Sequence, residues 1–269
     1  MYSYQDSQIK PFASQVNDKL KEAQIYHGTL LPNGHIALAT VQGGGLFILN
    51  SQGQLAKKIG KKEGLRSDRV FTTYVDQQQG SWLGLDDGIA RIETDRLTYY
   101  SEQLGLKGRV QSLTRHNNTL YAATSFGVYR LNTQTPQNRF DAIGNNKRQC
   151  WSLLSTEQGL LFGCNRGLLL LKGDDPQTQT VEIIQQGAGI YYSLYRLNSD
   201  PQKILVAQRD GLALLSLSQT GEKKGSNAQW HYQPYLADEV KTTVREIAED
   251  KTHGIWLGSD NGDLLRIAL

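Results

Sequence analysis

Short apolar runs, each bounded by glycine or another turn-forming residue, recur along the whole chain. Ile36–Thr40 is followed by Gly45 and the run Leu46–Leu49, and Leu120–Thr124 is followed by Gly127 and another apolar run. An amphipathic helix would instead repeat its apolar positions every three or four residues, over roughly ten residues or more. The pattern therefore predicts β-strands joined by tight turns.

The turn glycine after the first strand of each pair recurs with a nearly constant spacing of 39–51 residues. Its six copies are Gly45, Gly88, Gly127, Gly167, Gly211 and Gly262. A period of about 40–50 residues is typical of a four-stranded propeller blade. We therefore predict an all-β fold, a single β-propeller domain over residues 1–269 with four-stranded antiparallel blades. Its six repeats lie at about 24–62, 63–103, 104–144, 145–186, 187–236 and 237–269.

One strand precedes each pair and is expected to be the innermost of its blade. These strands are predicted at 24–31, 70–76, 110–115, 151–156, 191–197 and 243–250. The last repeat ends without an outer strand, and an uncovered sheet edge is unfavourable. We expect the N-terminal segment 1–23 to supply that strand and close a six-bladed ring. The alternative is that the chain is a piece of a longer array, such as a seven-bladed ring.

Charge and composition exclude several classes of partner. Lys and Arg total 29 against 26 Asp and Glu, which gives a net charge of +3, too balanced for a nucleic-acid-binding protein. No apolar run reaches the roughly 18 residues needed to span a bilayer. The first residues, Met1 to Asp6, lack the basic start and apolar middle of a signal peptide. We expect neither nucleic-acid binding nor membrane insertion by this chain.

Two repeats carry a more specific pattern. One reads Gly64-Leu65 … Val70 … Asp76 … Gly80-Ser81-Trp82-Leu83-Gly84 … Gly88, and the other reads Val244 … Asp250 … Gly254-Ile255-Trp256-Leu257-Gly258 … Gly262. This pattern resembles the two-component regulator propeller repeat of bacterial sensor proteins. The resemblance implies a non-catalytic sensor domain of a membrane-bound signalling receptor, located in the periplasm, with its signalling domains outside this chain. Propellers of that family commonly have seven blades, whereas six repeats are visible here.

The signature residues have structural interpretations. Trp82 and Trp256 are expected to pack between adjacent blades, where a large ring buries well. Asp76 and Asp250, which stand just before a turn, are expected to accept hydrogen bonds from turn N–H groups. Asp260-Asn261-Gly262-Asp263 bears a faint likeness to a calcium loop, but a plain turn is favoured because no Glu follows at the required spacing.

No linear motif for catalysis is present. The five histidines are scattered without a His-x-x-x-His pair, and the chain has neither a Gly-x-Ser-x-Gly elbow nor a phosphate loop. We therefore expect no catalytic residue, no metal and no cofactor. Two alternatives remain open: a propeller enzyme, such as a lyase or hydrolase with a site assembled from several blades, and a protein–protein interaction scaffold.

Cys150 and Cys164 are the only cysteines. If the strands around them form a hairpin that turns near residues 157–159, the two residues face each other. Cross-strand neighbours are close enough for a disulfide, which persists in an oxidising compartment. The alternative is a pair of buried thiols that pack as small apolar groups.

Propeller topology brings the links between blades and the turns after each second strand to the same face. On this face we predict a site for a polar ligand, such as a carbohydrate or an acidic small molecule, with homodimerisation as a further option. The alternative is that these groups are ordinary solvated loop residues. The candidate ligand-binding residues are Arg66, Arg69, Asp86, Arg109, Phe126, Arg148, Arg166, Tyr191, Arg209 and Asp210.

Overall fold

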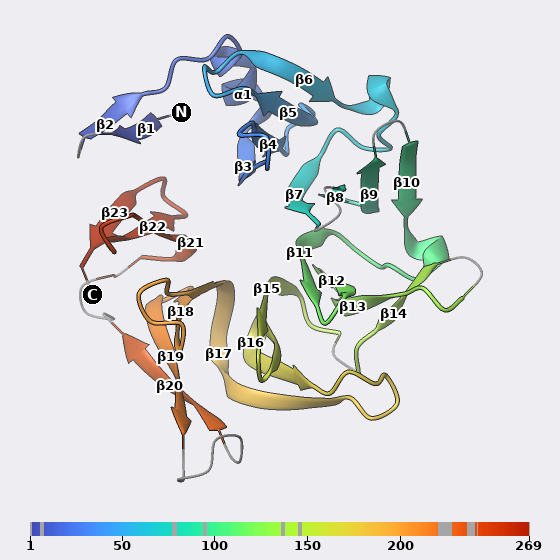
Figure 1. Cartoon of the computed structure of the whole chain (residues 1–269), viewed down its shortest axis with the longest axis vertical. Helices are drawn as coiled ribbons and strands as arrows, with labels where there is room; N and C mark the ends of the chain where they lie inside the picture. Colours follow the sequence, from blue (N-terminus) through green and yellow to red (C-terminus); the bar gives the residue numbers. More distant parts are fainter. Residues whose placement is uncertain are drawn as a thin grey trace. The chain divides into compact units, whose positions relative to one another are not determined.

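The computed structural model describes residues 2–5, 8–76, 80–93, 96–135, 138–144, 147–219, 228–235, 240 and 242–268. The chain divides into two compact units. Unit 1 comprises Met1–Leu113 and Tyr129–Ala142, and unit 2 comprises Thr114–Val128 and Ile143–Leu269. Strands dominate both units (Figure 1).

Unit 1 holds two antiparallel four-stranded sheets of consecutive strands. The first has the order β3-β4-β5-β6 and the second the order β7-β8-β9-β10, so each strand pairs with its neighbour in the sequence. The bounds are β3 Ile25–Leu30, β4 Ile36–Thr40, β5 Leu46–Leu49, β6 Leu55–Ile59, β7 Val70–Val75, β8 Ser81–Leu85, β9 Gly88–Glu93 and β10 Arg96–Tyr100; the short 3-10 helices η1 Lys61–Glu63 and η2 Glu102–Leu104 follow β6 and β10.

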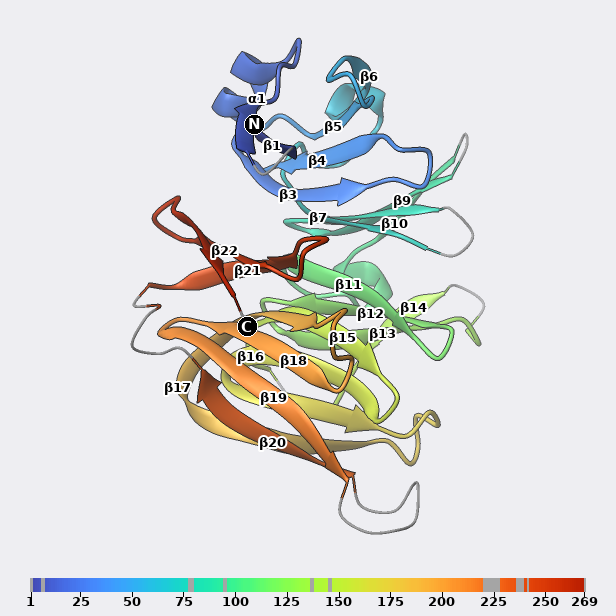
Figure 2. The same ribbon diagram turned by 60° about the vertical axis from the view of Figure 1, so that its left-hand side comes forward.

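The N-terminal segment forms a hairpin and a helix of its own. β1 (Tyr2–Gln5) pairs with β2 (Gln8–Pro11) in a two-stranded sheet of its own, and α1 (Asn17–Ala23) follows. The helix buries Leu20 and Ala23 in a cluster with Leu38 and Phe47 of the first sheet. Figure 2 shows α1 beside β4 and β5. The strands of this segment pair with each other and its helix packs on the first sheet. None of its described residues forms a strand of the last sheet.

The third repeat forms the sheet β11-β12-β13-β14, and its residues are divided between the two units. Its strands are β11 Val110–His116, β12 Thr119–Thr124, β13 Gly127–Asn132 and β14 Arg139–Ala142.

Unit 2 contains a six-stranded sheet in which the fourth and fifth repeats are joined. β15 (Cys150–Thr156) pairs with the first half of β16 (Gly159–Lys172), and the second half of β16 pairs with the start of β17 (Thr180–Arg196). β16 doubles back on itself, so that its two ends lie side by side. A Cβ on Gly159 would lie only 2.1 Å from the carbonyl oxygen of Leu171. The far half of β17 then begins the fifth repeat.

The fifth repeat continues through β18 (Lys203–Gln208), β19 (Gly211–Gln219) and β20 (Ala228–Tyr235), side by side in Figure 2. The sixth comprises β21 (Val244–Glu249), β22 (Ile255–Ser259) and β23 (Leu264–Ile267), a three-stranded sheet in the described part of the chain. The predicted all-β class with four-stranded antiparallel blades is confirmed. Six separate four-stranded blades are not observed, because β17 runs through two repeats and the last sheet has three described strands.

The repeated glycine has a physical role that Gly88 illustrates. Its φ is +138°, and a Cβ there would lie 2.1 Å from the carbonyl oxygen of Tyr100 at the end of β10. Only glycine allows this approach of two backbones. Positive φ also occurs at Gly45, Gly127, Gly211 and Gly262, whereas in the fourth repeat Arg166 adopts it (64°) in place of Gly167.

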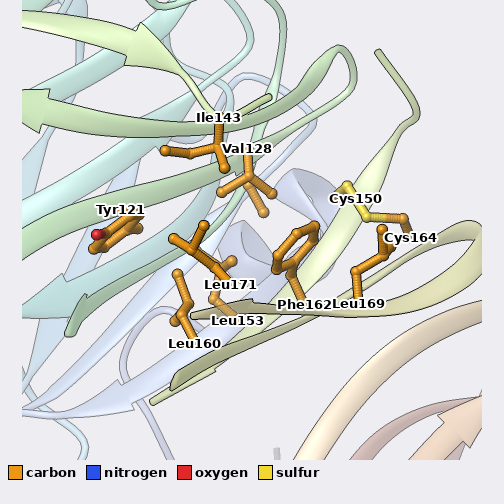
Figure 3. Close-up of a cluster of buried hydrophobic side chains, with 11 residues drawn as sticks. Tyr121, Val128, Ile143, Cys150, Leu153, Leu160, Phe162, Cys164, Leu169 and Leu171 are labelled. Atoms are coloured by element: carbon orange, nitrogen blue, oxygen red, sulfur yellow. A yellow bond between two sulfur atoms is a disulfide. The ribbon is translucent and has the colours of Figure 1, made fainter. Parts of the chain in front are cut away.

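Apolar side chains form separate clusters between consecutive repeats. One joins the first and second repeats through Leu46 and Leu83, and another joins the fifth and sixth through Leu212 and Leu257. Figure 3 shows the cluster of the third and fourth repeats, which includes Tyr121, Phe162 and Leu169 and the disulfide between Cys150 and Cys164. The two cysteines face each other in the predicted register and are fully buried.

Candidate functional site

Asp76, the signature aspartate of the second repeat, organises its neighbours and is structural. Its Oδ1 accepts the Gly80 N–H (2.8 Å), and its Oδ2 accepts the Trp82 indole N–H (2.9 Å). The Arg91 guanidinium lies 3.6 Å from Oδ2 and over the indole ring, 5.1 Å from its centroid. Trp82 is 1% exposed, so the indole packs in the core and cannot stack on a ligand.

The sixth repeat builds the same arrangement around Asp250. Gly254 N–H and the Trp256 indole donate to its carboxylate at 2.9 and 3.0 Å, and Arg266 donates from Nε at 3.0 Å and lies over the indole. The predicted acceptor role of Asp76 and Asp250 matches these bonds. The arginine, 15 or 16 residues after the aspartate, escaped the sequence analysis although both repeats contain it.

A β-bulge recurs in five repeats near the point where the innermost strand starts to pair with the next strand. The register of pairing shifts on either side of Tyr26, Phe71, Trp151, Tyr192 and Arg245. A bulge leaves one residue out of the hydrogen-bonded ladder and redirects its side chain, a device common beside binding sites. These five residues are aromatic or cationic, and Gln111 holds the corresponding second position of β11.

In unit 1 the bulge residues Tyr26 and Phe71 lie together with Arg69, Arg109 and Asp86. We call these five residues the Phe71 cluster. The Tyr26 ring meets Phe71 edge-on with centroids 5.4 Å apart, and Arg109 and Arg69 lie 4.6 and 5.8 Å from the Phe71 centroid. Arg69 Nε donates to the Val41 carbonyl (3.2 Å), while its Nη1 lies 4.0 Å from Asp86. Phe71 is thereby covered by groups that remain accessible to solvent.

In unit 2 the bulge residues Trp151, Tyr192 and Arg245 lie together with Asp260. We call these four residues the Tyr192 cluster. Trp151 meets Tyr192 edge-on at 5.3 Å, and the Arg245 guanidinium stacks on the Tyr192 ring at 3.7 Å. Arg245 also binds both carboxylate oxygens of Asp260, through Nε and through Nη2 at 3.0 Å. An aromatic platform and a paired charge thus stand together.

Glu246 follows Arg245 and adds a titratable group beside this cluster. The surrounding protein withdraws solvent from its carboxyl and raises its pKa to about 6, and a hydrogen bond with Ser193 partly opposes that rise. Its side chain nonetheless keeps accessible surface. Accessible area and desolvation differ here because a group can touch water and still be surrounded by protein on most sides.

The structure brings some of the predicted loop residues together and separates others. Arg69, Asp86 and Arg109 meet in the Phe71 cluster, whereas Arg66 lies beside the phenol of Tyr99. Arg148 donates to the Arg166 carbonyl (3.3 Å), and the Arg209 carbonyl accepts the Thr243 hydroxyl. Phe126 is 57% exposed, and Asp210 lies on the exposed turn after β18.

Tyr191 is a correction to the predicted site. Its side chain is 3% exposed, packs edge-on against Tyr232, and has a pKa raised to about 12, chiefly by burial. Tyr192, one residue later, is the bulge residue and is partly exposed. The sequence analysis missed Tyr26, Phe71, Tyr192 and Arg245, because the bulge at which they stand depends on how two strands pair.

One serine–histidine contact requires a check for nucleophilic chemistry. His116 Nδ1 lies 2.9 Å from Ser155 Oγ, and Asn117 Nδ2 lies 3.4 Å from His116 Nε2 while donating to Asp174 at 2.5 Å. Because a carboxylate only accepts, the amide must present N–H groups to both, so Nε2 accepts and Nδ1 carries the proton. In this tautomer His116 donates to Ser155.

Within the described residues no group of three or more His, Cys, Asp or Glu side chains is placed to hold a metal ion. Of the helices in the described chain, none has the length and apolar character to cross a membrane.

The chain is similar in fold to several solved structures. The extracellular domain of BT4673 from B. thetaiotaomicron, named as a hybrid two component system, superposes with a TM-score of 0.71 at 18% identity. The similarity covers all of this chain and 35% of that one, so the chain spans about a third of that domain. No family model and no curated protein sequence matches the chain.

Two other solved structures are also similar in fold to the chain. Virginiamycin B lyase from Staphylococcus aureus has a TM-score of 0.69 at 11% identity, covering 95% of this chain and 87% of that one. The Cps50 (Swd1) β-propeller domain of Myceliophteria thermophila has a TM-score of 0.63 at 13% identity, covering 90% and 84%. At these identities the comparisons show the fold, a β-propeller, and sensors and enzymes both use it.

Proposed function

We propose that this chain is the ligand-sensing β-propeller of an extracytoplasmic bacterial receptor and binds its ligand without chemical turnover. The observation that carries the proposal is the recurrent bulge, which places an aromatic or cationic side chain at the same position in at least five repeats. Tyr26 is 48% exposed, Trp151, Tyr192 and Arg245 are partly exposed, and Phe71 is buried. Four of these five side chains therefore reach solvent, which packing alone does not require.

Two further observations support the receptor context. The signature repeats resemble those of two-component sensors, and the fold matches the extracellular domain of one such receptor along the whole chain. The disulfide between Cys150 and Cys164 suits an oxidising compartment, since cytosolic thiols are normally kept reduced. The periplasmic location and the linked signalling domains belong to this proposal.

The lyase likeness is the reason to test for turnover directly. Each of the signature aspartates is occupied by structural hydrogen bonds, and His116 is oriented to donate to Ser155. In the described residues these groups offer no general base beside a nucleophile. A sensing role needs only the binding groups of the two clusters.

The test is a binding and turnover screen on the purified chain. Mono- and oligosaccharides and small organic acids are screened by thermal shift, and every hit is incubated with the protein and analysed by mass spectrometry. We expect saturable stabilisation and unchanged ligand mass, with Tyr192→Ala or Phe71→Ala reducing the shift and Lys172→Ala, at an exposed ion pair, leaving it intact. Turnover of a hit that is lost with the bulge variants would reject the proposal.

A further inference from the structure

The first repeat carries apolar residues at the three signature positions of the second. Leu31 closes the same turn that Asp76 closes, because the backbone N–H of each donates to the carbonyl oxygen four residues later. Ala37 of β4 pairs with Ile48 of β5 at the register where the tryptophan and the arginine of the second repeat pair. Leu31, Ala37 and Ile48 therefore stand in place of the aspartate, the tryptophan and the arginine.

A small residue at the tryptophan position is peculiar to the first repeat. In the other five repeats this position, six residues before the turn glycine, holds a large side chain: Trp82, Tyr121, Leu161, Leu205 and Trp256. Tyr121, Leu161 and Leu205 each belong to the cluster between their own repeat and the next. Ala37 belongs likewise to the cluster between the first and second repeats, where it leaves volume that a larger side chain would fill.

A cavity of about 90 Å³ lies at this place and is lined from both of the first two sheets. Leu31, Ala37 and Ile48 all contribute to its lining. Its floor is closed, since Ala37 is 1% and Leu83 0% exposed, whereas Ile48 and Ile92 are partly exposed at its mouth. An apolar cavity of roughly 150 Å³ stays dry and takes up benzene, so the space here suits one small ring that extends toward the mouth.

A lysine stands at the edge of this cavity. Among the described residues that line it, Lys57 of β6 alone is charged. Lys57 pairs with Ile48, so its side chain lies on the same face of the first sheet as the cavity. It is also exposed, which places its ammonium at the mouth. The next residue, Lys58, lies on the opposite face, 5.1 Å from the centroid of the Phe47 ring.

These features select a class of ligand. The cavity takes the place of an indole, so its position between two sheets favours a flat ring. In the second repeat Asp76 accepts the Trp82 indole N–H, whereas Leu31 offers no acceptor. The Thr73 hydroxyl, which also lines the cavity, is already hydrogen-bonded with that of Thr29 (2.5 Å). A ring without polar groups is therefore favoured inside, and an anionic group is favoured beside the lysine at the mouth.

We propose that the cavity between the first and second repeats binds a small aromatic carboxylate of the benzoate class, with its ring against Ala37 and its carboxylate beside Lys57. The residues that line the cavity are not members of the Phe71 cluster or of the Tyr192 cluster. The inference therefore goes beyond the proposed sensing site and is independent of it.

The experiment titrates the full chain, labelled in its methyl groups, with sodium benzoate, benzyl alcohol and sodium acetate, followed by NMR. Benzyl alcohol keeps the ring without the charge, and acetate keeps the charge without the ring. We expect benzoate to bind at about millimolar concentration or below, about threefold or more tightly than benzyl alcohol, as an exposed ion pair implies, and acetate not to bind. The benzoate ring protons should show nuclear Overhauser effects to the methyl groups of Ile48, Leu83 and Ile92.

The variants test the two halves of the site separately. Ala37→Leu introduces the residue of the fourth and fifth repeats, which should fill the cavity and abolish benzoate binding. Lys57→Gln should weaken benzoate binding about threefold or more and leave benzyl alcohol binding unchanged. Lys58→Gln is the matched control, since it removes the adjacent lysine on the opposite face, and it should change neither. If the leucine variant does not fold, the Overhauser effects in the wild-type chain locate the ligand by themselves.

Four outcomes would overturn the inference. They are a wild-type chain that does not bind benzoate, benzoate binding that survives Ala37→Leu, Overhauser effects confined to methyl groups outside the cavity, and benzyl alcohol binding as tightly as benzoate. None of them bears on the sensing proposal, which is tested with variants of the two clusters.

Discussion

At the scale of single residues, the signature of the two best repeats is explained by one carboxylate that serves several donors. The Asp76 side chain is fully buried, and it accepts from a turn N–H and an indole N–H while an arginine neutralises it. A buried carboxylate is tolerated only when it is paired and hydrogen-bonded. The aspartate, glycine, tryptophan and arginine are therefore one structural unit.

Asp76→Ala should be strongly destabilising, because it leaves the Trp82 indole N–H and the Arg91 charge without their acceptor in a buried place. Breaking such a group typically costs about 3–5 kcal/mol of unfolding free energy, measured here by urea denaturation. Asp87→Ala, on the neighbouring exposed turn, should change it by less than about 0.5 kcal/mol. Equal effects of the two variants would contradict this account.

Asp250 predicts an acid dependence of stability. The Thr252 hydroxyl foremost, then Arg266, Gly254 and Trp256, hold the pKa of this carboxyl well below 3.8, against the opposing effect of burial. The unfolded chain therefore takes up this proton first, so the stabilisation is complete above about pH 4 and is lost as the pH falls toward the lower folded-state pKa.

Asp250→Asn provides the comparison, because the amide cannot ionise. Wild type should have the higher melting temperature at pH 7, and the difference should shrink steadily below about pH 4. Thermal denaturation in a series of buffers from neutral to acid measures this. A difference between the two proteins that is constant over the whole range would exclude the ionised Asp250 as its source.

At the scale of strands, the sequence predicts where a strand such as β7 begins and ends, but it does not predict the β-bulges. The innermost strand predicted at 70–76 is β7, Val70–Val75, because the flanking turn residues and the apolar run mark its limits. A bulge, in contrast, depends on how two strands pair, and no residue type announces it. The sequence analysis therefore names Tyr191 for the site, whereas the partly exposed residue is the adjacent Tyr192.

The same reason limits what could be predicted of the site. Arg69, Asp86 and Arg109 were identified because loops on one face of a propeller gather charged residues, and the structure brings these three together. Phe71, on which both arginines lie, was assigned to an ordinary strand. The joining of two repeats through β17 could not be predicted either, because Gly187 and Gly189 indicate a turn at the point where the strand continues.

The adjacent tyrosines give a test of the bulge. Tyr191→Ala empties a core position and should cost about 3–5 kcal/mol of unfolding free energy, as for other large aromatic residues. Tyr192→Ala removes contacts with Trp151 and Arg245 at a partly exposed place and should cost about 0.5–2 kcal/mol. Urea denaturation of both variants decides the matter, and a larger loss for Tyr192→Ala would place the bulge wrongly.

At the scale of the whole molecule, stability is distributed over the clusters between consecutive repeats. Separate apolar clusters join the first and second, the third and fourth, the fourth and fifth, and the fifth and sixth repeats. In such arrays stability is approximately a sum of repeat and nearest-neighbour contributions, so damage in one cluster weakens its neighbours most. The cluster of the third and fourth repeats is the one with a covalent link.

Loss of the disulfide should destabilise the protein, and its formation should depend on the cellular compartment in which the protein is expressed. The disulfide closes a loop between residues 14 apart, for which the unfolded-state entropy predicts about 2–4 kcal/mol. The double variant Cys150→Ala, Cys164→Ala should lose this amount in urea denaturation, with amides of β15 and β16 losing the most hydrogen-exchange protection. Wild type unfolded with a reductant should behave like the variant, whereas a reductant should leave the variant unchanged.

Because the chain is more stable oxidised, expression in a bacterial periplasm should yield more folded protein than expression in the cytoplasm. Equal yields of equally stable protein from both compartments would remove this support for an extracytoplasmic location.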